Sequence, residues 1–114
     1  MFTCIPPKEA VSVVRDKLVC DPTLRQRTNL SVNNICDLLR LCLNSTYFVY
    51  GGKYYKQKHG CGLGSPCSPI IANLYMEHFE TKALSTYKGQ KPTIWLRYVD
   101  DTFVEYGTVW AEKV

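Results

Sequence analysis

The stretch TIWLRYVDDTFVEY, residues 93–106, places two runs rich in β-branched and aromatic residues on either side of Asp100 and Asp101. Such runs predict two strands, and the acidic pair between them predicts a hairpin with both carboxylates at its tip. Aspartate is an ordinary turn residue, but a tight two-residue turn prefers glycine or asparagine, which this tip lacks. Two adjacent carboxylates repel each other unless a cation compensates them. The tip is therefore suited to binding a hard cation such as Mg²⁺.

Upstream of this hairpin, apolar residues at helical spacing predict three helices. The first begins at Pro6 and Pro7, the second follows Ser31 as N-cap, and the third begins at Ser68. The residues at helical spacing are Val11, Val14 and Leu18 in the first helix, Val32, Ile35, Cys36, Leu39, Cys42 and Leu43 in the second, and Ala72, Tyr75, Met76, Phe79 and Ala83 in the third. Packing alone explains the second set, so it predicts a buried face and no chemistry.

Residues 46–57 predict a second hairpin, in which Gly51 and Gly52 form a two-residue turn between aromatic runs. Lys53, Lys56 and Lys58 lie among these aromatics. Basic residues interleaved with aromatic ones can hold phosphates and stack on bases, but a hairpin also carries such residues as a solvated face. The local pattern leaves both interpretations open.

The glycine-rich segment GCGLGSP, residues 60–66, leads into the third helix. Backbone N–H groups in such a loop can approach a phosphate or a sugar closely, although glycine loops are common and the signal alone is weak. A zinc site built from His59, Cys61 and Cys67 is an alternative, but their spacing fits no common zinc finger. His78 is interpreted as a partly exposed helix residue rather than a base.

Composition restricts the class of protein more than its activity. With 114 residues and 46% apolar content, the chain is long enough for one small domain. The six cysteines form no Cys-x-x-Cys pair and follow no signal peptide, which predicts reduced thiols inside a cell. No apolar run reaches the length of a membrane span, which predicts a soluble protein. We expect an intracellular location, with the nucleus as one candidate compartment. The net charge of +4 is compatible with nucleic acid and with many other partners.

Several of these segments together resemble one family. Tyr98-Val99-Asp100-Asp101 resembles the Tyr-x-Asp-Asp signature on the palm hairpin of reverse transcriptases. Residues 64–75, GSPCSPIIANLY, resemble the loop and helix of that family that hold the incoming nucleotide and the template, and residues 2–6, FTCIP, resemble the segment that follows its first catalytic aspartate. With residues 28–31 and 47–49, the resemblance covers nearly the whole chain and is closest to Penelope-like retroelement reverse transcriptases.

The resemblance implies an α+β fold, in which helices pack on a small antiparallel sheet as in the fingers and palm of a reverse transcriptase. It also implies template-directed nucleotidyl transfer with Mg²⁺, or Mn²⁺, on an RNA template, a DNA primer and deoxynucleoside triphosphates. By resemblance, Asp100 is a direct metal ligand and Asp101 is its less directly coordinating neighbour. The resemblance also places Tyr98 beneath the primer terminus and makes Phe2 the residue that blocks a ribose 2′-hydroxyl. The nucleotide pocket is then bordered by Gly64, Ser65 and Pro66. The Gly64 loop is then expected on the same side of the sheet as the acidic tip.

Two departures from the family pattern limit these expectations. The first catalytic aspartate is expected five residues before Phe2, which is upstream of Met1, and residues 107–114 drift from the family. We therefore expect residues 1–114 to be a partial reverse transcriptase domain, without the first aspartate segment and the thumb, that is inactive by itself. A non-catalytic nucleic-acid-binding remnant and a decayed retroelement product are the alternatives.

Overall fold

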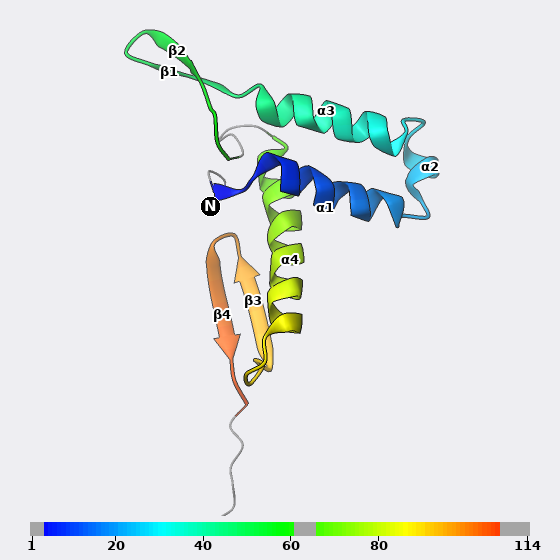
Figure 1. Ribbon diagram of the computed structural model, residues 1–114, viewed down its shortest axis with the longest axis vertical. Coiled ribbons are helices and arrows are strands. Elements are labelled where there is room, and N and C mark those ends of the chain that lie inside the picture. The colour runs from blue at the N-terminus through cyan, green and yellow to red at the C-terminus, as the bar shows by residue number, and fades with distance from the viewer. Residues whose placement is uncertain (1–3, 61–65, 108–114) are drawn as a thin grey trace, which may run out of the picture. The chain divides into compact units, whose positions relative to one another are not determined.

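The computed structural model describes residues 4–60 and 66–107. It confirms the α+β class: four helices and four strands lie in the described residues, and the strands form two separate two-stranded antiparallel sheets (Figure 1). The chain divides into two compact units, Met1–Phe79 and Glu80–Val114. Among the residues described, no helix is long and apolar enough to cross a membrane.

The first helix, α1, spans Pro7–Val19 and begins as the sequence predicts. Proline fits the first helical turn, where its missing N–H would have no partner within the helix. After α1, the Asp21 carboxylate accepts hydrogen bonds from the Thr23 N–H and hydroxyl, at 2.9 and 2.8 Å. It also pairs with Arg27, in the one-turn helix α2, Leu24–Arg27, which the sequence pattern did not indicate. Asp21 thus organises the turn that separates α1 from the next long helix.

Helix α3, Val32–Asn44, has the N-cap that its sequence predicts. The Ser31 hydroxyl accepts a hydrogen bond from the Asn34 N–H at 3.1 Å, which satisfies a backbone donor at the start of the helix. Of the predicted stripe, Cys36 and Leu43 are buried, whereas Cys42 is exposed. The buried face of α3 is therefore narrower than the stripe.

The hydrophobic core belongs to the unit Met1–Phe79. Helices α1 and α3 run in opposite directions and pack against each other (Figure 1). The core also includes residues from α4, Ser68–Thr86. Its buried members are Ile5, Ala10, Val11, Val14, Cys36, Leu43, Ile71 and Ala72. Side chains of three helices, together with Ile5 before α1, therefore form one core.

The predicted buried side of α4 is correct only for the first part of the helix. Ala72 is buried and Tyr75 packs against the core, but Phe79 is 53% exposed and Ala83 is exposed as well. Ile71, outside the predicted set, is buried. Among the described residues of the first unit, the buried core therefore includes the early turns of α4 but not Phe79.

Tyr75 connects α4 to α1 within this unit, because its hydroxyl donates a hydrogen bond to the Glu9 carboxylate at 3.2 Å. Burial raises the pKa of the Tyr75 hydroxyl above its ordinary value, and the hydrogen bond to Glu9 and its negative charge act in the same direction. The neutral hydroxyl is thus the form that the folded unit favours.

Both predicted hairpins form. Strands β1, Tyr47–Tyr50, and β2, Lys53–Lys56, are joined by Gly51 and Gly52, whose φ angles of 58° and 75° suit the type I′ turn that glycine favours. Strands β3, Ile94–Tyr98, and β4, Asp101–Glu105, form the second hairpin.

Candidate active site and nucleic-acid interface

The register of β3 and β4 determines where the two aspartates lie. Tyr98 pairs with Asp101, so the turn between the strands consists of Val99 and Asp100. The sequence predicted both carboxylates in the turn, and this prediction is wrong for Asp101. Asp100 lies in the turn, whereas Asp101 is the first residue of β4. The structure keeps the two residues adjacent and exposed, at the loop end of the hairpin.

Val99 carries the strain of this turn. Its φ angle is 55°, and no other non-glycine residue in the described ranges has a positive φ. A β-branched side chain is poorly suited to this region, and such a conformation costs of order 1–3 kcal/mol. The absence of glycine from this turn, which is visible in the sequence, thus results in a strained backbone at Val99. Strain of this kind occurs preferentially at functional sites.

Arg97 lies between the helix α4 and the strained turn. Its Nε donates to the Glu80 carboxylate at 2.5 Å, and its Nη1 donates to the Val99 carbonyl oxygen at 3.1 Å. The Arg97 and Glu80 side chains are only 11% and 15% exposed. Sequence reasoning missed both residues. Its one available signal was a charged residue within an otherwise apolar and aromatic strand, directly before Tyr98.

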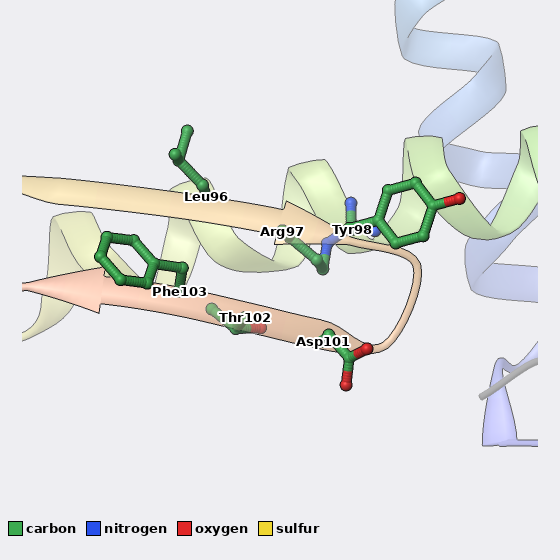
Figure 2. Close-up of a pocket in the computed structure, with 6 residues that line it drawn as sticks. All are labelled: Leu96, Arg97, Tyr98, Asp101, Thr102 and Phe103. Carbon is green, nitrogen blue, oxygen red and sulfur yellow. The ribbon is translucent and has the colours of Figure 1, made fainter.

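The other face of the hairpin is open and apolar. Leu96 and Phe103 oppose each other across the strands and are 61% and 62% exposed, and Tyr98 is 81% exposed. These three side chains and Asp101 are among the residues that line a shallow pocket of about 300 Å³, and Figure 2 shows how they lie on the two strands. The acidic residues are therefore bordered by exposed aromatic and apolar surface.

The donor chemistry of the tip fits a hard divalent cation. Asp100 and Asp101 offer carboxylate oxygens, and neither forms an ion pair with a residue that the structure describes. No group of three His, Cys, Asp or Glu side chains lies together in residues 4–60 and 66–107. The two aspartates thus supply part of a metal-binding set in the described part of the chain, and a complete set needs further oxygen ligands.

Comparison with known families decides the assignment. The family model described as reverse transcriptase (RNA-dependent DNA polymerase) matches residues 16–108, which include the whole acidic hairpin. The chain belongs to the reverse transcriptase family. No curated protein and no solved structure matches it. Reverse transcriptases use divalent metal ions and act on a template, a primer and deoxynucleoside triphosphates, in agreement with the partners expected from the sequence.

Other residues expected from the reverse transcriptase resemblance are placed only in part. Phe2, Gly64 and Ser65 lie outside the described residues, so the expected position of the Gly64 loop relative to the acidic tip is untested. Pro66 is exposed in the turn that precedes α4. Of the alternative zinc ligands, Cys61 also lies outside the described residues. His78 is exposed on α4, as expected.

The β1–β2 hairpin gives this reverse transcriptase an exposed basic and aromatic surface. Phe48 and Tyr55 are paired across the strands and their rings stack, with centroids 5.5 Å apart and planes 18° from parallel. All eight strand residues are exposed. The hairpin lysines, Lys53, Lys56 and Lys58, are exposed as well, and residues 45–60 contain no acidic residue. Solvated face and nucleic-acid interface both remain compatible with this geometry.

Proposed function

We propose that this chain supplies the metal-binding palm hairpin of an RNA-directed DNA polymerase, with Asp100 and Asp101 as ligands of Mg²⁺ or Mn²⁺. The observation that carries the proposal is the strained Val99–Asp100 turn, which presents two adjacent carboxylates without a cationic partner among the described residues. This turn lies inside the region that matches the reverse transcriptase family. The segments that most resemble Penelope-like elements support that subgroup.

The residues around the turn have separate tasks in this proposal. Asp100, in the turn, binds metal directly, and Asp101, at the start of β4, adds negative charge and a second carboxylate. The bound ions would activate the primer hydroxyl and stabilise the leaving pyrophosphate. Tyr98, which is 81% exposed and pairs with Asp101, provides a surface beneath the primer terminus. Pro66, with Phe2, Gly64 and Ser65, is proposed to border the nucleotide.

We further propose that the 114-residue chain alone does not polymerise DNA. Two-metal catalysis takes carboxylates from separate elements, and the described residues place no third His, Cys, Asp or Glu side chain with the Asp100–Asp101 pair. Loss of a ligand costs several kcal/mol of transition-state stabilisation, and each ~1.4 kcal/mol lowers the rate tenfold. Activity should therefore fall below detection.

Primer extension on an RNA template with Mg²⁺ tests this proposal. The 114-residue chain is compared with a longer version that adds an upstream segment bearing the family aspartate and a downstream thumb segment. Extension by the longer version that is abolished by Asp100→Asn would support the proposed site. Robust extension by the 114-residue chain would contradict its inactivity, and silence of both versions would favour the decayed-element alternative.

A second activity, binding of single-stranded nucleic acid, is favoured by the β1–β2 hairpin. The hairpin lysines can neutralise phosphates while the exposed rings of Phe48 and Tyr55 stack on bases. Each phosphate contact contributes about 0.7 to the slope of log affinity against log salt for a single strand. Replacement of all three hairpin lysines by glutamine should therefore reduce the slope by about 2.

Fluorescence titration of a labelled oligonucleotide at several salt concentrations measures this slope. A matched control replaces three exposed lysines of the other unit, Lys82, Lys88 and Lys91, by glutamine and so changes the net charge equally. The control should leave most of the slope intact. Equal effects of the two triple variants would mean that general charge, and not the β1–β2 hairpin, attracts the strand.

A further inference from the structure

We propose that Arg97 is a positioning residue that holds the Val99–Asp100 turn in its strained conformation, and that Glu80 fixes the Arg97 guanidinium in place. The positioning itself follows from geometry that needs no metal. Its importance for metal binding rests on the function proposed above for Asp100 and Asp101.

The contacts of Arg97 point in two directions. Nε reaches the Glu80 carboxylate on α4 at 2.5 Å, and Nη1 reaches the Val99 carbonyl oxygen at 3.1 Å. A guanidinium is a planar group with several donors in fixed directions, so it can bind both acceptors simultaneously. A lysine ammonium is a compact charge on a flexible stem and reproduces this arrangement poorly. The geometry thus uses a property that distinguishes arginine from lysine.

The acceptor on the turn is the carbonyl of the strained residue itself. Val99 has a φ angle of 55°, and its carbonyl carbon forms the peptide bond to Asp100. A charge-assisted hydrogen bond to this oxygen restrains the peptide that orients Asp100. Because Arg97 and Glu80 are mostly buried, the guanidinium has little freedom to leave this position. A strained conformation persists only where its surroundings determine it, and Arg97 supplies such a determinant.

A purely structural role is the alternative. In that case the Arg97–Glu80 pair only attaches β3 to α4, and the hydrogen bond to Val99 has no influence on the turn. The two roles differ in what happens at Val99. Positioning requires that the turn conformation changes when Arg97 is replaced, whereas attachment affects the stability of the hairpin whatever residue occupies position 99.

Nuclear magnetic resonance of the 114-residue chain without metal reads the turn directly. The three-bond HN–Hα coupling and the Cα chemical shift of Val99 report its positive φ. Arg97→Met should shift both toward the values of ordinary negative φ, and Arg97→Lys should give a smaller shift because it keeps the charge. Arg40→Met is the matched control, since Arg40 forms an exposed pair with Asp37 in the other unit. Unchanged Val99 signals in a folded Arg97→Met or Arg97→Lys chain would overturn the proposal.

A double-mutant cycle keeps the test decisive if Arg97→Met unfolds the hairpin. Val99→Gly removes the steric cost of positive φ, so the turn needs less restraint from Arg97. Arg97→Lys should then lower the melting temperature less than half as much in the Val99→Gly background as in the unaltered chain. Equal losses in both backgrounds would assign Arg97 to attachment alone and overturn the proposal.

Mn²⁺ binding, measured by electron paramagnetic resonance, separates this proposal from the proposed function. If Arg97 positions the metal ligands, Arg97→Lys should weaken Mn²⁺ binding at least threefold, and Arg40→Met should not. If the unaltered chain binds no Mn²⁺ while Val99 still responds to Arg97, the metal site fails and the positioning role stands. If Mn²⁺ binds equally well to the unaltered chain and to Arg97→Lys, the positioning has no consequence for the metal, and that part of the proposal fails.

Discussion

Asp100→Asn should make the acidic hairpin more stable without metal and less stable with it. Asp100 and Asp101 are adjacent, exposed and without a cationic partner in the residues described. At a separation of about 6 Å, two such charges repel by about 0.7 kcal/mol in water, and by about half of that after screening by physiological salt. Asparagine is nearly isosteric and removes this repulsion. We therefore expect a gain of about 0.3–0.7 kcal/mol in the presence of a chelator.

Magnesium should make the unaltered chain more stable than Asp100→Asn, the reverse of their order in chelator. A ligand that binds only the folded state stabilises it by RT ln(1 + [L]/Kd), which is about 1.4 kcal/mol for a concentration tenfold above the dissociation constant. The unaltered chain should gain most of this energy in Mg²⁺, and Asp100→Asn should gain little because it lacks a carboxylate ligand. The two stability curves should thus cross as Mg²⁺ is added.

Urea unfolding followed by tryptophan fluorescence measures both effects. Trp95 lies in β3 and is 38% exposed, so its emission reports on the acidic hairpin. The chain has a second tryptophan, Trp110, and a Trp110→Phe background isolates the Trp95 signal. Asp37→Asn is the matched control, because Asp37 pairs with Arg40 on α3 and should respond to Mg²⁺ no more than the unaltered chain does. The reasoning would be refuted if Asp100→Asn had a lower free energy of unfolding than the unaltered chain in the presence of a chelator. It would also be refuted if Mg²⁺ raised the free energy of unfolding of both proteins equally.

Three further predictions concern the unit Met1–Phe79. Ser31→Ala removes the acceptor for the Asn34 N–H and should lower the free energy of unfolding by about 1 kcal/mol. Urea unfolding followed by circular dichroism measures this loss, and an unchanged value would show that water replaces the cap. Leu43→Ala truncates a residue that is 3% exposed and should lower the free energy of unfolding by about 2–5 kcal/mol in the same assay. A loss below about 1 kcal/mol would contradict the assigned core. Because the pKa of Tyr75 is raised in the folded unit, its contribution is fully present below the unfolded pKa of about 10 and is lost as pH rises through the folded value. The melting temperature of Tyr75→Phe should therefore fall less steeply above that pH, and parallel pH profiles would contradict the link to Glu9.

The elements that the sequence predicted correctly depend on local signals. Ser31 caps α3 because a hydroxyl in that position satisfies a nearby backbone donor, whatever the remainder of the fold. Gly51 and Gly52 adopt positive φ angles because glycine lacks a Cβ atom, and this alone determines the first hairpin turn. Such features involve residues a few positions apart and can be recognised without tertiary structure.

The errors involve contacts that local patterns do not contain. Helical spacing correctly identifies a face of α4, but it gives no information on how far along that face a core extends, and Phe79 was wrongly predicted to be buried. The pairing of Arg97 with Glu80 joins a strand to a helix across 17 positions of sequence. Nothing in the periodicity of either segment indicates it. The same holds for the register that places Asp101 in β4 instead of the turn.

The acidic turn shows how a local conflict in a sequence can indicate function. A hairpin that needed only stability would place glycine or asparagine at the position of Val99, and the first hairpin of this chain does use glycine in its turn. At the second hairpin, the sequence has a β-branched residue in the left-handed region, and beside it two carboxylates that form no ion pair with any residue described in the structure. Each choice opposes folding, and neither is explained by packing, since the turn is exposed. The strain at Val99 persists if its surroundings hold the turn in one conformation, as proposed for Arg97, and the aspartates are compensated if a divalent cation binds them. Local rules are therefore broken at the turn that we propose as the metal-binding site.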